Sequence, residues 1–80
     1  MTYKIVGQIG SGDAPKLRRA AHCLGWFHIG RSRWHIPARF DWDPGSAAQL
    51  VADKAGVWAM LISPGLSASR SPKRPFEVSA

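Results

Sequence analysis

The chain has 80 residues, enough for one domain with a small core. No apolar run is long enough to cross a bilayer, and the N-terminus lacks the layout of a signal peptide. The single cysteine, Cys23, excludes an intramolecular disulfide, so we expect a cytoplasmic protein in a reducing environment.

The net charge of +6 comes from eleven Lys and Arg residues against five acidic residues. The basic residues gather in residues 1–40 and in the C-terminal tail, whereas residues 41–69 are slightly acidic. This distribution suits a polyanionic partner such as a nucleic acid or a nucleoprotein, although basic charge also serves solubility alone.

Residues 2–9 alternate apolar and polar side chains and predict a strand. Asp13 is a good N-cap for a helix that Gly25 ends. The apolar stripe of this helix recurs at helical spacing, and its cations lie off the stripe. The stripe consists of Leu17, Ala20, Ala21 and Leu24, and the cations are Lys16, Arg18 and Arg19.

Residues 26–42 hold three of the four tryptophans and alternate apolar with polar residues, as a half-buried β-hairpin does. We place the turn in residues 30–33, with an even loop of two or four residues that sets His28 opposite His35. A three-residue loop would shift the register by one and scramble the faces. One face is then apolar, and the other carries His28, His35, Arg39 and Asp41, with Trp26 nearby.

Asp43 and Pro44 start a second helix, which Gly56 closes. Residues 57–62 form an apolar run of strand length. The Ser-, Pro- and Arg/Lys-rich residues 64–80 predict a flexible basic tail, with a short edge strand as an option at 76–78. Its Ser-Pro-Lys segment resembles the minor-groove-binding tails of some chromatin proteins.

This order predicts a single α+β domain over residues 1–63, with the βαββαβ arrangement of ferredoxin-like or related folds. Two helices would pack on one face of an antiparallel sheet and leave the other face open. Pro37 conflicts with a central third strand because proline cannot donate to the ladder. The strands at 2–9 and 57–62 would leave open edges on which a homodimer could form.

The open face would display Lys4, Gln8, Trp26, His28, His35 and Arg39, with Trp58 as a further candidate. Aromatic rings stack on bases and neighbouring cations hold phosphates. The element order resembles that of RNA-recognition motifs, which bind RNA on such a face, but residues 34–42 lack their glycine-aromatic consensus.

Our first hypothesis is a non-enzymatic domain that binds RNA or single-stranded nucleic acid, rather than duplex DNA, through the hairpin and the first helix. No cofactor is implied, and the spacing of histidines and cysteine does not suit a metal site. The predicted contact residues are Lys16, Arg18, Arg19, Trp26, His28, Arg31, Arg33, His35, Arg39, Lys73 and Arg74.

Two alternatives belong to other classes. The first is an inhibitor that binds a host defence protein, by analogy in size with the anti-CRISPR proteins of phages and mobile elements. The second is a ribonuclease in which His28 and His35 act as base and acid. The chain weakly resembles HicA-type mRNA interferase toxins, but the distance of His35 from the turn glycine departs from their pattern. That resemblance rests on Gly25, Trp26, Gly30, Ser32, His35, Ala55 and Gly56.

Overall fold

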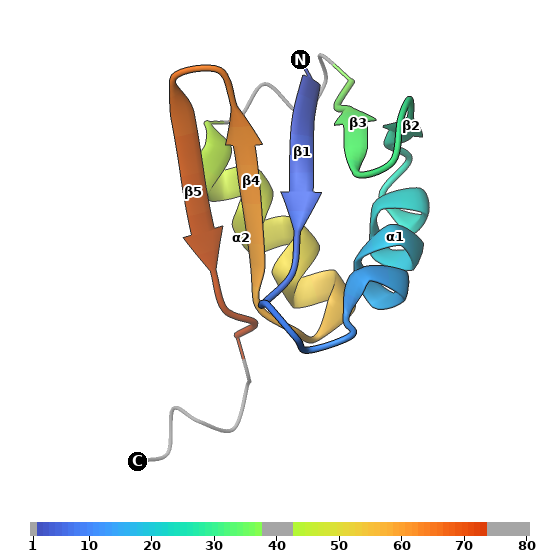
Figure 1. Cartoon of the computed structure of the whole chain (residues 1–80), viewed down its shortest axis with the longest axis vertical. Coiled ribbons are helices and arrows are strands. Elements are labelled where there is room, and N and C mark those ends of the chain that lie inside the picture. Colours follow the sequence, from blue (N-terminus) through green and yellow to red (C-terminus); the bar gives the residue numbers. More distant parts are fainter. Residues whose placement is uncertain (1, 38–42, 74–80) are drawn as a thin grey trace.

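The computed structural model describes residues 2–37 and 43–73, where two helices pack against one face of an antiparallel sheet (Figure 1). The strand order is β2-β3-β1-β4-β5, which confirms the predicted α+β class and adds a fifth strand to it. The elements are β1 (Thr2–Val6), α1 (Ala14–Cys23), β2 (Phe27–His28), β3 (Arg33–His35), α2 (Pro44–Ala55), β4 (Ala59–Ser63) and β5 (Leu66–Arg70).

Strand β1 lies at the centre of the sheet, paired antiparallel with β3 on one side and β4 on the other. Its alternating residues send Tyr3 and Ile5 into the core and leave Lys4 exposed. The edges of the sheet are therefore β2 and β5, and our prediction of open edges at 2–9 and 57–62 was wrong. Strand β3 ends at His35, so Pro37 lies beyond the ladder and the conflict that it raised does not arise.

The region predicted as tail begins with a well-formed strand. Pro64 and Gly65 turn the chain, with Gly65 at a φ of 81°, and β5 pairs with β4 at five positions from Ser63↔Leu66 to Ala59↔Arg70. The segment after β5 is held by α2: Gln49 Nε2 donates to the Ser71 carbonyl (2.7 Å) and the Lys73 amide donates to Asp53 Oδ1 (2.6 Å). The domain boundary that we placed at residue 63 therefore falls inside a hairpin.

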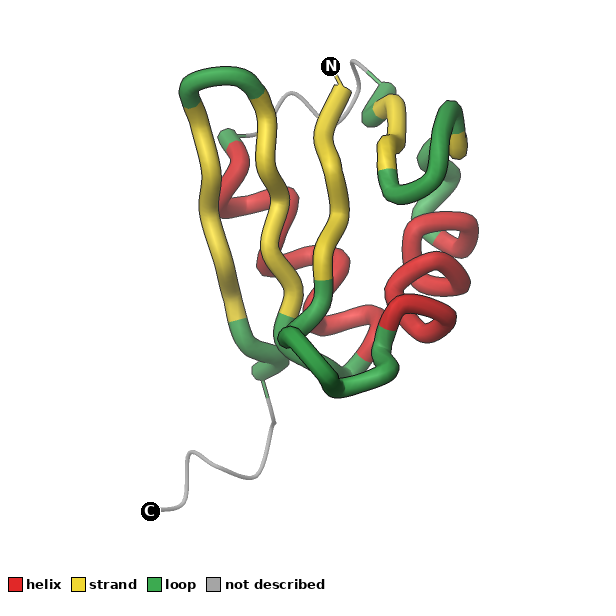
Figure 2. Tube along the Cα trace, in the orientation of Figure 1, coloured by secondary structure: helices red, strands yellow, loops and turns green. Residues whose placement is uncertain are grey.

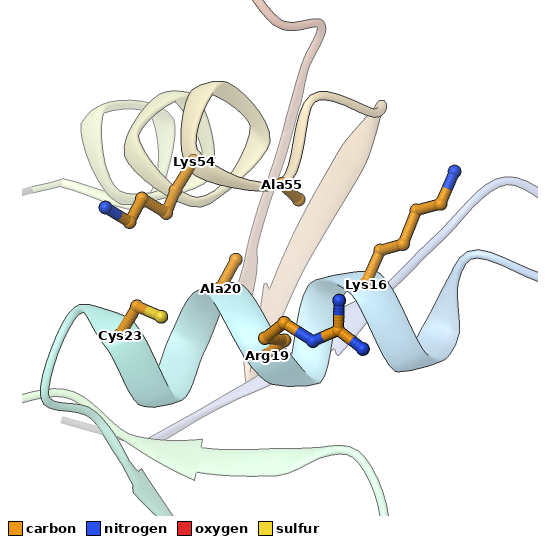
Figure 3. Close-up of a pocket in the computed structure, with 6 residues that line it drawn as sticks. All are labelled: Lys16, Arg19, Ala20, Cys23, Lys54 and Ala55. Atoms are coloured by element: carbon orange, nitrogen blue, oxygen red, sulfur yellow. The ribbon is translucent and has the colours of Figure 1, made fainter.

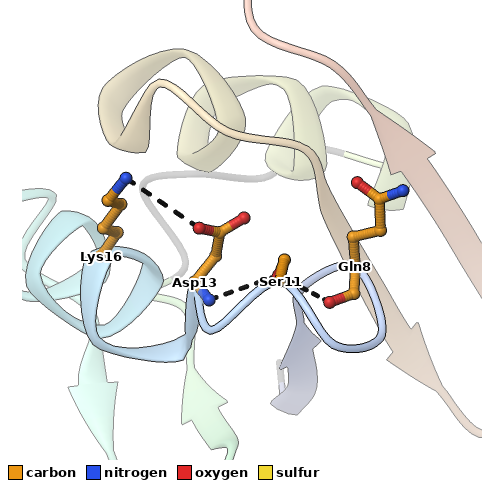
Figure 4. A network of polar contacts seen from close by, with 4 residues as sticks. All are labelled: Gln8, Ser11, Asp13 and Lys16. Atoms are coloured by element: carbon orange, nitrogen blue, oxygen red, sulfur yellow. Dashed lines mark hydrogen bonds and ion pairs between the residues drawn. The ribbon is translucent and has the colours of Figure 1, made fainter.

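The two helices begin differently despite their similar start signals. Asp43 caps α2 through its side chain, which accepts from the Ser46 amide at 2.7 Å. Asp13 makes no such bond at α1; its carboxylate lies 4.0 Å from Lys16 Nζ, and its own amide donates to Ser11 Oγ (Figure 4). Gly56 closes α2 at a φ of 75°, as predicted.

The core lies between the sheet and the two helices. Helix α2 covers β4 and β5, and α1 packs against α2, β1 and β2. Alanines on both helices let the elements approach closely. The buried cluster consists of Tyr3, Ile5, Leu17, Ala20, Ala21, Trp26, Trp34, Ile36, Ala47, Ala48, Val51, Ala52, Ala59 and Leu61.

Candidate functional site

The register of the β2–β3 hairpin differs by one residue from our prediction. Phe27 pairs with His35 and His28 with Trp34, and the Ile29 amide donates to the Arg33 carbonyl at 3.0 Å. The loop is thus the three-residue Gly30–Ser32 that we rejected; Figure 2 shows it joining two short strands. Because adjacent residues of a strand face opposite ways, His28 and His35 lie on opposite faces of the sheet.

Burial of Trp26 gives the reason for this register. The Trp26 side chain is 2% exposed, whereas Phe27 is 60% and Ile29 52% exposed. Tryptophan removes more apolar area from water than either neighbour, so the fold buries it and turns Phe27 outward. Our placement of Trp26 on the exposed face was wrong, and its ring offers no stacking surface there.

The sheet face turned away from the helices, which we call the open face, carries two cations directly opposite each other. Lys4 on β1 pairs with Arg33 on β3, and both are exposed. One register step along, Thr2 pairs with His35, whose ring lies 6.2 Å from that of Phe27. The residues of this face are Thr2, Lys4, Val6, Phe27, Arg33, His35, Met60, Ile62, Ser67 and Ser69.

No strand of the described sheet contains an acidic residue, so no carboxylate within the strands offsets these two cations. Like charges placed directly opposite each other in a sheet are destabilising. A shallow hollow of about 370 Å³ lies beside the pair, lined by Lys4, Arg33, Ile62 and Pro64 together with Thr2, Tyr3 and Ser63. The arrangement can therefore hold an anionic group against an apolar surface.

Arg31 and Arg33, which we expected to act together at the hairpin tip, are divided between the two faces. Arg33 lines the hollow on the open face. Arg31 lines a small hollow of about 40 Å³ on the helix side, together with Arg18, Leu17 and Trp34. Arg31 and Arg33 are thus two residues apart in the sequence but lie on opposite sides of the sheet, so variants of the two can be compared.

His28 belongs to an aromatic cluster on the helix side of the hairpin. Its ring stacks on that of Trp34, with centroids 4.6 Å apart, and its Nε2 lies 2.9 Å from the Arg31 carbonyl. His22 of α1 meets Trp34 edge-on at 4.9 Å. These contacts give His28 a structural part in holding the turn, and the histidine pair on which we based the ribonuclease hypothesis is not formed.

Two of the three cations of α1 border a groove between the helices. Lys16 and Arg19 of α1 and Lys54 of α2 line a hollow of about 170 Å³, with Cys23 also at its border (Figure 3). The three cationic side chains point in different directions in this view and do not converge on one point. This groove lies on the helix layer, away from the open face.

The predicted contact residues thus divide among several surfaces. The open face has Arg33 and His35; the helix side has Lys16, Arg18, Arg19, His28 and Arg31; Lys73 is held beside α2 through its amide. Arg39, Arg74 and the optional strand at 76–78 lie outside the described residues. Phe27 was missed because we assigned it to the core. Lys4 was placed on the open face but left out of the contact set.

The described residues contain no group of three or more His, Cys, Asp or Glu side chains that could hold a metal ion. None of their helices has the length and apolarity needed to cross a membrane.

Comparison with known proteins finds no matching family model, no matching characterised protein and no matching solved structure. The ferredoxin-like arrangement therefore stays a prediction, and the open face itself is the basis for a functional proposal.

Proposed function

We propose that the protein binds single-stranded nucleic acid, RNA in the first instance, on the open face of its sheet. The observation that carries this proposal is the Lys4–Arg33 pair beside the exposed Phe27 and His35 rings. A phosphate between two opposed cations relieves their repulsion, because it supplies the negative charge that the strands lack.

The aromatic pair supplies the second half of the site. Phe27 exposes 60% of its surface and so presents an uncovered ring beside that of His35. A base can stack on such a ring whatever its sequence, and flanking arginine and lysine hold the backbone. Bases are free to do this only when they are unpaired, so the site suits a single strand better than a duplex.

The test uses the fact that Arg33 lies on the open face and Arg31 on the helix side. Fluorescence anisotropy with a labelled single-stranded RNA would be measured for wild type, Arg33→Gln and Arg31→Gln at several salt concentrations. Loss of one phosphate contact should lower the slope of log K against log salt by about 0.7 for Arg33→Gln. Arg31→Gln removes the same charge two residues away but from the helix side, so its slope and affinity should stay close to those of wild type.

Phe27→Ala should weaken binding by about tenfold without changing the salt slope, because it removes stacking and not charge. If both arginine variants lose the same affinity for RNA, binding depends on the net charge of the protein and not on the open face. No binding of RNA at low salt would overturn the proposal.

A second candidate is the protein-binding inhibitor. Its support is that the same face also carries the apolar side chains of Val6, Met60 and Ile62, of which Ile62 is 36% exposed. This candidate gains if the protein does not bind nucleic acid but Lys4→Glu abolishes capture of a defined protein partner.

A further inference from the structure

A second aromatic position lies on the same side of the sheet, beyond the cation pair. Trp58 directly precedes β4 and borders a hollow of about 450 Å³ together with Val6 and Met60. Val6 and Met60 are register partners on the open face, so this hollow continues that face. Gly7, Gln8 and Ile9 complete its lining, and Ile9 is 99% exposed.

The register places the parts of the face in a fixed order. His35 pairs with Thr2, Arg33 with Lys4 on the next step, and Met60 with Val6 on the step after that. Trp58 lies two residues before Met60 in the chain, which places it one register step further from the cations. Phe27 and His35 therefore stand at one end, the two cations come next, and Trp58 stands at the other end.

Building on the proposed function, we infer that the open face is a two-position site, with one base stacked at Phe27–His35, another at Trp58, and the intervening backbone held by Lys4 and Arg33. Three register steps of two residues span roughly 20 Å at about 3.4 Å per residue. A strand advances roughly 3.4 Å per nucleotide when stacked and about twice that when its bases are splayed apart, so the two positions need about four to seven nucleotides.

A nucleic acid is the occupant that this order favours. The hollow at Trp58 is apolar and receives a planar base, whereas the cations that precede it face a backbone charge. The two hollows share no residue, but Lys4 and Val6 are successive open-face positions of β1, as Ile62 and Met60 are of β4, so the hollows lie next to each other on that face.

The experiment is a length series of labelled oligouridylates from two to ten nucleotides, titrated against wild type and Trp58→Leu. For wild type we expect affinity to rise by about tenfold between three and seven nucleotides and then to level off. Trp58→Leu should remove that rise and leave the affinity for the trimer within about twofold of wild type. The trimer thus also shows that the variant is folded.

The outcomes separate the two proposals. If wild type binds all lengths with the same affinity, or if Trp58→Leu weakens the trimer and the heptamer equally, the two-position site is wrong while the nucleic-acid proposal stands. If wild type binds no length at low salt, the proposed function itself fails. The wild-type series alone decides the matter should the Trp58 variant not fold.

Discussion

The two hairpins of the sheet each follow a helix, yet they are held in place by different means. The β2–β3 hairpin has only two residue pairs and depends on the buried Trp34 and its contacts with α1. The β4–β5 hairpin has five residue pairs, a tight Pro-Gly turn and small polar side chains on its outer strand. Between its own two strands the first hairpin has the shorter main-chain ladder; β3 gains three further pairs with β1, and α2 packs on both strands of the second hairpin.

The largest expected effect is in the first hairpin. Trp34→Ala should lower the free energy of unfolding by about 3–5 kcal/mol, since it opens a cavity among buried residues and removes the ring on which His28 stacks. Phe27→Ala, in the same hairpin but on the exposed face, should change it by less than about 1 kcal/mol. Urea denaturation followed by circular dichroism measures both, and similar values would show that the hairpin does not depend on its buried face.

The turns should respond in the opposite order. Gly65→Ala should cost about 1–2 kcal/mol, because the residue has a φ of 81° and an added Cβ would be strained by its backbone alone, with open space around it. At Gly30 the nearest atoms to an added Cβ all belong to the Arg33 side chain, and the closest is Nε at 3.1 Å, in the movable outer part of that side chain. Gly30→Ala should therefore change thermal unfolding little. A larger loss at Gly30 than at Gly65 would refute this contrast.

The helix starts give a smaller contrast. Asp43→Ala should lower the Tm by a few degrees because α2 loses its cap, whereas Asp13→Ala should have a lesser effect since Asp13 makes no cap bond. Thermal unfolding of both variants at neutral pH provides the test. Equal shifts would mean that the Ser46 bond contributes nothing beyond the removed charge.

The same cap should be visible in the pH dependence of stability. Hydrogen bonds from Ser46 hold the pKa of Asp43 below its ordinary value of 3.8, with a smaller contribution from the charge of Arg70. A depressed carboxyl pKa stabilises the folded state above the ordinary value, and this contribution is lost as the pH falls through the lower, folded pKa. The Tm difference between wild type and Asp43→Ala should therefore be constant from pH 5 to 7 and shrink below about pH 4.

The sequence predicted the helices better than the sheet, for physical reasons. The Asp and Gly signals and the apolar stripe of α1 are local, and both helices lie where they were expected. The register of a strand pair depends on which of two adjacent side chains is buried. The alternation of apolar and polar residues did not show that Trp26, and not Phe27, would be the buried one. Strand β5 was missed because its serines suggested a tail, whereas Pro64 and Gly65 already favoured a turn.

The candidate site shows the same limit. Charge and aromatic content directed attention to the hairpin, but a shift of one residue moved His28 to the helix side and brought Phe27 to the open face. Lys4 and Arg33 are far apart in sequence, and only the pairing of β1 with β3 places them opposite each other. Such a pair has no local signature.

The central position of β1 also determines the order in which the domain can be completed during synthesis. Strand β1 leaves the ribosome before both of its partners, residues 33–35 on one side and residues 60–62 on the other. A nascent chain that ends before β4 therefore presents β1 as an unpaired edge, with the buried side chains of Tyr3 and Ile5 uncovered. The domain can close only when nearly all of the described chain has emerged, and premature termination would yield a fragment prone to pair with other chains.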